Sequence, residues 1–211
     1  MADLAAGTGK FTALLLPTGA SVVGIEPVEG MRRVLRQKLP TVPVVAGTAE
    51  AMPIKSSSLD AVSVAQAFHW FDAEKAFVEL ARVLRPGGRV GFAWNARDRS
   101  VDWVDGVWAI MDEVERRAPW RDHDNWRDAA FGQRRHFGPL ESESFRHEHV
   151  TTPAGVVERI LGVSHVAALP APEQQAVLDK VRRLLDEHPD TRGRPELGIP
   201  YRVDCSWTER R

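Results

Sequence analysis

The fold is decided near the N-terminus by the stretch Asp3-Leu4-Ala5-Ala6-Gly7-Thr8-Gly9-Lys10-Phe11-Thr12. A short apolar run leads into this stretch, and a helix-like run over residues 11–16 follows it. Its glycines and small neighbours let a ligand approach the backbone closely, because nothing larger than a methyl or hydroxyl group intrudes. The N-terminus of the following helix offers unpaired N–H groups to an anion. Asp3 adds a carboxylate at the strand end, so the junction suits a ligand that carries both an ammonium and a carboxylate group.

Strand and helix patterns alternate along the first half of the chain. Short apolar runs predict strands over residues 2–6, 21–25, 42–46, 59–65 and 89–94, and helical spacing predicts helices over 9–16, 28–38 and 73–84. We expect Pro17 to stop the first helix and Pro86-Gly87-Gly88 to form a hard turn. This alternation predicts an α/β fold, in which a parallel sheet has helices on both faces.

The 28–38 helix is predicted to be amphipathic. Its apolar residues are Val28, Met31, Val34 and Leu35, and the opposite side carries Arg32, Arg33, Arg36 and Lys38. We therefore expect the arginines to lie on the solvated side of this helix.

The second half of the chain has a different pattern. Residues 101–118 predict a helix with one apolar stripe, made of Val104, Val107, Trp108, Met111 and Val114. Residues 119–140 are charged, aromatic and rich in turns, so we interpret the region of about 100–140 as a helical insertion or lid. A strand over 145–150 and helices over 153–161 and 172–187 follow.

The last segment alternates in a way that predicts an antiparallel strand. Ile199, Tyr201, Val203, Cys205 and Trp207 share one face, and Arg202, Asp204, Ser206 and Thr208 share the other. Pro200 fits only near the start of such a strand or on an edge. With no linker or repeat in the sequence, we expect residues 1–211 to form one domain.

Composition excludes several classes of partner. The chain has 211 residues with a net charge of -1, so no basic surface favours nucleic acid. It has one cysteine, which excludes a disulfide framework, and no apolar run as long as a membrane span. We expect a cytoplasmic protein that binds neither nucleic acid nor membranes and acts on a small molecule.

Candidate binding residues follow the expected strands. Ligands of an open parallel sheet bind outside the carboxyl ends of its strands. Glu26 ends the second strand, where an acid can accept both ribose hydroxyls, and we favour this role over a solvated glutamate that caps the next helix. Met31 could pack on an adenine ring or belong to the core. Thr48-Ala49-Glu50 could meet the adenine edge or form a plain polar loop.

These motifs together resemble the class I S-adenosylmethionine-dependent methyltransferases. The family's first motif is an acid on strand one followed by G-x-G-x-G, and here Asp3 precedes Ala5, Gly7 and Gly9, with alanine in place of the first glycine. Glu26 matches the strand-two acid, residues 59–62 match the fourth strand, and residues 84–89 match the turn before the fifth. The dinucleotide fingerprint G-x-G-x-x-G fits less well, because its third glycine is Thr12.

The resemblance implies a Rossmann-like, seven-stranded, mostly parallel sheet with an antiparallel last strand. It also implies S-adenosyl-L-methionine as the cofactor. At Thr48 relatives often carry an aspartate that meets the adenine amino group, so that hydrogen bond is in question here. The implied cofactor-binding residues are Asp3, Ala5, Ala6, Gly7, Thr8, Gly9, Glu26, Pro27, Met31, Thr48, Ala49, Glu50, Ala65 and Gln66.

Residues 65–72 are similar to the strand-four exit of a small-molecule subgroup that includes trans-aconitate methyltransferase-like proteins. This places His69, Trp70, Trp94 and Asn95 in a substrate pocket, beside a tryptophan-rich segment over 94–126. His69 is the candidate base, because the unperturbed pKa of histidine lies near neutrality. Alternatively, His69 only shapes the pocket wall. No spacing of histidines indicates a metal site.

The first motif begins at the third residue, whereas relatives carry a helical segment before it. We expect a shortened version of a longer protein, with an open cofactor cleft and bare apolar surface that favours self-association. Alternatively, residues 100–140 fold back over the cofactor cleft and replace the missing N-terminal segment. The sequence leaves three functions to compare: a small-molecule methyltransferase, a cofactor-binding protein with weak or no activity, and a nucleotide-dependent oxidoreductase.

Overall fold

The computed structural model describes residues 1–115 and 136–211, and gives the backbone alone for residues 115, 164 and 165. The described chain divides into two compact units. The first unit holds residues 1–94, 136–144 and 204–211, and the second holds residues 95–115 and 145–203. No helix within the described residues is both long and apolar enough to span a membrane.

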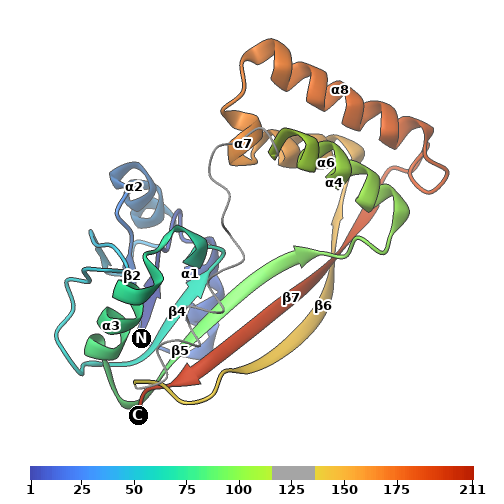
Figure 1. The fold of residues 1–211 in the computed structure, drawn as a ribbon. Coiled ribbons are helices and arrows are strands. Elements are labelled where there is room, and N and C mark those ends of the chain that lie inside the picture. The colour runs from blue at the N-terminus through green and yellow to red at the C-terminus, as the bar shows by residue number, and fades with distance from the viewer. Residues whose placement is uncertain (116–135) are drawn as a thin grey trace. The chain divides into compact units, whose positions relative to one another are not determined.

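One seven-stranded sheet runs in the order β3-β2-β1-β4-β5-β7-β6. Its strands are β1 (Ala2–Leu4), β2 (Val23–Ile25), β3 (Val44–Val45), β4 (Leu59–Ala65), β5 (Leu84–Arg97), β6 (Glu141–Thr151) and β7 (Leu197–Glu209). The pairs β1–β2, β1–β4, β2–β3 and β4–β5 are parallel, and β7 runs antiparallel to its neighbours (Figure 1). The predicted α/β fold with an antiparallel last strand is therefore confirmed.

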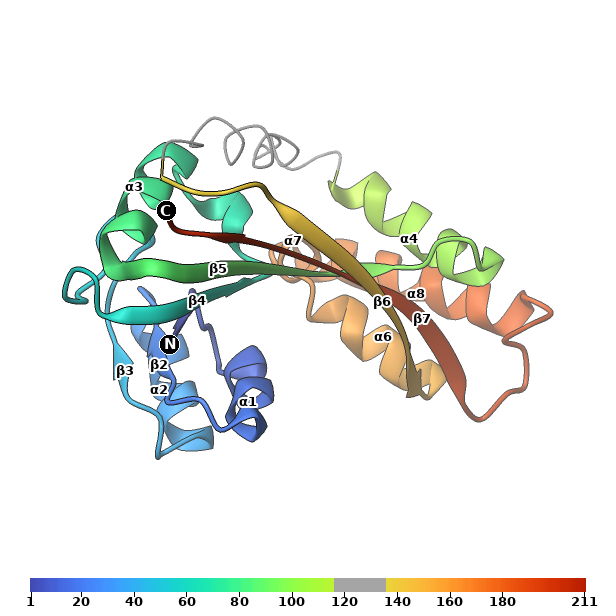
Figure 2. The same ribbon diagram turned by 90° about the horizontal axis from the view of Figure 1, so that it is seen from below.

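The helices of the first unit cover both faces of its strands. They are α1 (Lys10–Leu15), the 3₁₀ helix η1 (Leu16–Thr18), α2 (Glu29–Lys38), η2 (Phe68–Trp70) and α3 (Ala73–Val83). The helices α1 and α2 lie on one face and α3 lies on the other (Figure 2). The core between sheet and helices is apolar and aromatic, and Phe77 meets Phe92 and Phe137 at ring distances of 6.1 and 5.5 Å.

The second unit has a core of its own. It contains α4 (Asp102–Glu115), α6 (Pro153–Leu161), the short α7 (Ser164–Ala167) and α8 (Ala171–Glu187). The predicted stripe of α4 is confirmed, because all five of its apolar residues are buried in a cluster with Val156, Ile160 and Val181. The rest of the predicted 100–140 insertion lies mostly outside the described residues.

Some predicted strand boundaries are wrong, whereas the first helix stops at Pro17 as predicted: α1 ends at Leu15, and Pro17 lies in the 3₁₀ helix that follows. The strand predicted over 42–46 shrinks to two residues. The fifth strand begins at Leu84 rather than at residue 89: the ladder jumps from Leu59↔Leu84 to Ala61↔Arg89, so the expected Pro86-Gly87-Gly88 turn lies inside the strand as a bulge.

The last strand changes its buried face along its length. Ile199 and Tyr201 are buried as predicted, but farther along it is Ser206 and Thr208 that are buried. The Ser206 hydroxyl shares a 2.9 Å hydrogen bond with Ser142, and the Thr208 hydroxyl donates to the Gly138 carbonyl at 3.0 Å. Burial of these hydroxyls is therefore stabilised by polar partners, which a purely hydrophobic pattern cannot indicate.

The glycine turn generates a test of the packing between β1 and α2. Gly7 and Gly9 both have positive φ, at 55° and 82°, but a Cβ on Gly9 would lie 2.9 Å from Leu35 Cγ whereas one on Gly7 would meet open space. We expect Gly9→Ala to lower the free energy of unfolding by about 2–3 kcal/mol. Its matched control, Gly7→Ala, should cost about 1 kcal/mol. Urea titration measures both, and equal costs would contradict the packing role of Gly9.

Candidate functional site

A pocket of about 420 Å³ opens at the carboxyl ends of the first four strands. Strand order reverses here, because β1 pairs with β2 on one side and with β4 on the other. Such a switch point is where open parallel sheets bind ligands. The lining residues are Leu4, Ala5, Gly7, Glu26, Pro27, Val28, Met31, Gly47, Thr48, Ala49, Glu50, Ala65, Gln66, Ala67, Trp70 and Phe71.

Most of the residues predicted for the cofactor line this one pocket. They are Ala5, Gly7, Glu26, Pro27, Met31, Thr48, Ala49, Glu50, Ala65 and Gln66. Asp3, Ala6, Thr8 and Gly9 do not line it. The sequence did not single out Leu4, Val28, Gly47, Ala67 and Phe71, although each lies next to or near a predicted residue and could have been found by extending the strand-end loops.

The turn after β1 is built from left-handed backbone conformations. Ala5, Gly7 and Gly9 have φ values of 56°, 55° and 82°. Gln66, which leaves β4, also has a positive φ of 56°. Because non-glycine residues adopt this region at a cost of about 1–2 kcal/mol, two strand ends of the pocket hold strained backbone.

Asp3 lies buried beneath the turn and is 1 % exposed. Its carboxylate accepts hydrogen bonds from the Thr12 hydroxyl at 2.6 Å and from the Ser63 hydroxyl at 3.3 Å. Burial raises the pKa of the Asp3 carboxyl to about 6, because loss of hydration outweighs these two hydrogen bonds, which lower it. Thr12, which stands where a dinucleotide fingerprint has its third glycine, thus serves as a partner for Asp3.

Glu26 joins the ends of β1 and β2. Its carboxylate accepts the Gly7 N–H at 3.0 Å and the Val28 N–H at 2.9 Å. A carboxylate has about four acceptor positions, so two remain for a ligand. Glu26 also contacts the start of the next helix, because Val28, whose N–H it accepts, is the N-cap residue of α2.

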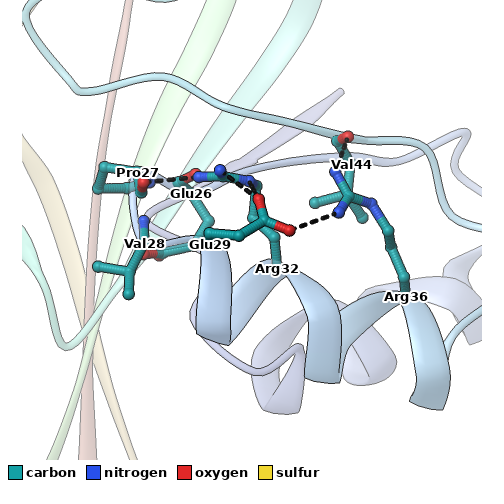
Figure 3. A network of polar contacts seen from close by, with 7 residues as sticks. All are labelled: Glu26, Pro27, Val28, Glu29, Arg32, Arg36 and Val44. Carbon is teal, nitrogen blue, oxygen red and sulfur yellow. Dashed lines mark hydrogen bonds and ion pairs between the residues drawn. The ribbon is translucent and has the colours of Figure 1, made fainter.

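Arg32 does not lie on the solvated side of α2, as the sequence pattern predicted. It is 9 % exposed, whereas Val28 and Met31 of the predicted apolar face are 50 % and 43 % exposed and line the pocket. The Arg32 guanidinium donates to the backbone carbonyls of Glu26 and Pro27 and to the Glu29 carboxylate (Figure 3). Polar partners in the adjoining loop account for the burial of this charge.

The loop after β3 forms another wall. Thr48 and Ala51 form an isolated antiparallel bridge, and the Glu50 carboxylate accepts the Asp72 N–H at 2.9 Å. The N–H of Met52 donates to Glu79 at 2.8 Å, and Arg82 donates to the Met52 carbonyl at 2.9 Å. Residues 48–52 are therefore held in place from α3.

The predicted substrate residues are not all brought together. Trp70 lines the pocket and is 62 % exposed, and the His69 ring lies 4.8 Å from it but does not line the pocket. Trp94 packs against the core of the first unit. Asn95 belongs to the second unit, where it forms a 3.2 Å hydrogen bond with His147. Across residues 1–115 and 136–211, no three His, Cys, Asp or Glu side chains are grouped as metal ligands.

Known proteins similar to this chain are methyltransferases. A family model described as "Methyltransferase domain" matches residues 2–92. An uncharacterized methyltransferase of Mycobacterium tuberculosis is 38 % identical over 203 residues, which span 96 % of this chain and 80 % of that protein. An uncharacterized methyltransferase-like protein of Schizosaccharomyces pombe is 31 % identical over 202 residues, covering 95 % and 78 % of the two chains.

Solved structures share the fold. A protein of Anabaena variabilis, described as a methyltransferase from an antibiotic biosynthesis pathway, superposes with a TM-score of 0.70 at 22 % identity and covers 97 % of this chain and 88 % of its own. Phosphoethanolamine N-methyltransferase 2 of Haemonchus contortus, in complex with S-adenosyl-L-methionine, superposes with a TM-score of 0.56 at 15 % identity, covering 99 % of this chain and 48 % of its own. At these identities the likeness concerns the fold alone.

The buried Asp3 generates a prediction about pH and stability. Its pKa is higher in the folded state, so the folded chain binds more protons than the unfolded chain between about pH 4 and pH 6, and stability falls as pH rises through that window. Relative to Asp3→Asn, the wild type should lose about 2–3 kcal/mol of unfolding free energy between pH 4 and pH 7. Urea titrations of both proteins across this range measure the difference, and parallel pH profiles would rule out a raised pKa.

Proposed function

The chain belongs to the class I S-adenosylmethionine-dependent methyltransferases, and we propose that its strand-end pocket binds S-adenosyl-L-methionine for methyl transfer to a small molecule. The observation that carries this proposal is the pocket itself, in which the glycine turn, the strand-two acid and the loop after β3 come together. Its volume is in the range of ordinary small-ligand sites.

In this proposal the adenosine part lies between β2 and β3. The two remaining acceptor positions of Glu26 receive the ribose hydroxyls, and the exposed Met31 side chain packs on one face of the adenine. The loop Thr48–Glu50 meets the adenine edge through backbone groups. Thr48 has a hydroxyl where relatives often have a carboxylate, so the hydrogen bonds of the adenine amino group come more from backbone acceptors here.

The amino-acid part of the cofactor lies over the turn at Ala5–Gly9. There its carboxylate lies beside the turn that precedes α1, where the partial positive charge of the start of that helix favours an anion. Asp3 does not line the pocket, so its carboxylate would act on the cofactor ammonium as a buried charge beneath the turn rather than as a wall of the site. Ammonium binding above Asp3 would in turn favour the ionised carboxylate.

The reaction is an in-line displacement at the sulfonium methyl. When bound, S-adenosyl-L-methionine would supply the methyl group: the acceptor atom would bond to the methyl carbon as the carbon–sulfur bond breaks, and the electron pair of that bond would stay on sulfur. The chain contributes mainly alignment and exclusion of water. A base is needed only for an acceptor that arrives protonated and weakly nucleophilic, and a carboxylate acceptor needs none.

The acceptor is proposed to be small and at least partly apolar, because Trp70 and Phe71 form an aromatic side of the pocket. Residues 65–72 resemble a small-molecule subgroup that includes trans-aconitate methyltransferase-like proteins, and we therefore propose an acceptor of the kind that this subgroup methylates. Screening a metabolite panel for release of S-adenosylhomocysteine would identify the acceptor.

Calorimetry tests the cofactor directly. S-adenosylhomocysteine should bind with one site per chain and NADH should not bind. Glu26→Ala should weaken binding of S-adenosylhomocysteine by about 1–3 kcal/mol, the cost of lost hydrogen bonds to a charged acceptor. Glu74→Ala, which removes an exposed glutamate in the first turn of α3, is the matched control and should bind like the wild type. Preference for NADH would refute the proposal and favour an oxidoreductase.

His69 separates two mechanisms. If it is the base, His69→Ala should lower turnover by about two to four powers of ten while S-adenosylhomocysteine affinity is kept. If His69 only shapes the wall beside Trp70, the loss should be small and should vary with acceptor size. Single-turnover assays on several acceptors measure this, and lost cofactor affinity would exclude both roles.

A further inference from the structure

The loop between β2 and α2 carries Glu26, and its backbone hydrogen bonds show how the loop is held. The Glu26 N–H donates to the Val45 carbonyl at 3.1 Å, and the Val28 N–H donates to the Glu26 carboxylate at 2.9 Å. Pro27 has no N–H. The carbonyls of Glu26 and Pro27 both accept from Nη1 of Arg32, at 2.7 and 2.6 Å.

Arg32 thus satisfies two carbonyls that neither sheet nor helix supplies with a donor. Its Nε and Nη2 atoms donate to the same Glu29 oxygen, at 3.0 and 2.5 Å, so one planar guanidinium bridges the loop and the first turn of α2 (Figure 3). The Glu29 carboxylate balances the charge, and the Arg32 hydrogen bond lowers the pKa of Glu29. This geometry needs the rigid fork of arginine and cannot be reproduced by the point charge of lysine.

From these contacts we propose that Arg32 is the positioning residue for ribose recognition: it fixes the loop so that the Glu26 carboxylate keeps two acceptor positions aimed into the pocket. This rests on the proposed function, since it assigns Arg32 a role in the same cofactor site. Arg32 itself does not line the pocket. It acts through the backbone of Glu26, whose carbonyl accepts from Arg32, while the Glu26 side chain accepts from the N–H groups of Gly7 and Val28, the latter on this same loop.

A second glutamate–arginine pair in the first unit holds a loop of the pocket in the same way, which supports the proposed role of Arg32. Glu79 and Arg82 on α3 repeat the spacing of Glu29 and Arg32 on α2. Arg82 donates to the carbonyls of Met52 and Ile54, at 2.9 and 2.8 Å, and so fixes the loop after β3. The two loops proposed to meet ribose and adenine are therefore each held by a glutamate–arginine pair on the helix beside them.

The test compares two ligands: S-adenosylhomocysteine and its analogue that lacks both ribose hydroxyls. Arg32→Met should bind S-adenosylhomocysteine about tenfold more weakly than the wild type, while its affinity for the analogue stays within about twofold. Arg32→Lys should fall between. A merely structural role of Arg32 would weaken both ligands equally, and that result would overturn the proposal.

Arg36→Met is the matched control. Arg36 lies one turn further along α2 and is half-exposed, and among the described residues its polar partners are Glu29 and the Val44 carbonyl, at 3.5 and 3.4 Å. Its loss removes the same charge without touching Glu26 or Pro27, so both ligands should bind as in the wild type. Thermal unfolding of each variant checks folding, and if Arg32→Met does not fold, the ligand ratio of Arg32→Lys decides the question.

A double-variant cycle separates this proposal from the proposed function. If Arg32 acts through Glu26, Glu26→Ala/Arg32→Met should bind S-adenosylhomocysteine as Glu26→Ala does. Additive losses would show an independent role for Arg32 and overturn the proposal. If the wild type does not bind S-adenosylhomocysteine, the proposed function is refuted. If Glu26→Ala binds it more weakly than the wild type but Arg32→Met binds it equally well, only the role of Arg32 is refuted.

Discussion

The hydrogen bond from the Gly7 N–H to the Glu26 carboxylate joins the two strand ends on which the pocket depends. Parallel strands end at one edge of the sheet with backbone groups that the ladder no longer pairs. Here β1 and β2 continue to contact each other beyond their ends through Ala6 N–H and the Ile25 carbonyl, and then through the side chain of Glu26. A bulky residue at Gly9 would separate α2 from this junction, because Leu35 packs there.

The sequence predicted the order and type of the elements well, because apolar runs and helical spacing were clear. Boundaries were predicted less well where hydrogen-bonded pairing, rather than burial, determines how far an element extends. The bulge at residues 85–88 lies within β5 because its flanks, Leu84 and Arg89, both pair with β4. The short α7 was not predicted, since four residues carry no periodicity.

The residues of the candidate site that follow strand ends were predicted, whereas those that are fixed by hydrogen-bond partners elsewhere in the chain were missed. Helical spacing assigned Arg32 to the solvated side of α2, and no pattern indicates that two carbonyls at Glu26 and Pro27 need its donors. The available signal was Glu29, three residues earlier on the same helix. Trp94 and Asn95 were predicted to lie at the end of the fifth strand, but β5 continues to Arg97, so both residues lie within the strand.

Departures from ordinary folding rules gather at the proposed cofactor pocket, and this is an argument for its function that is independent of any motif. Of the three non-glycine residues with positive φ in the described chain, Ala5 and Gln66 line the pocket. Asp3, with its buried carboxyl and raised pKa, lies directly before this turn. Each feature costs stability and would be removed by a simple substitution, such as glycine or asparagine. Strain and a buried charge at one edge of the sheet are expected where a site is shaped for a ligand rather than for the stability of the empty protein.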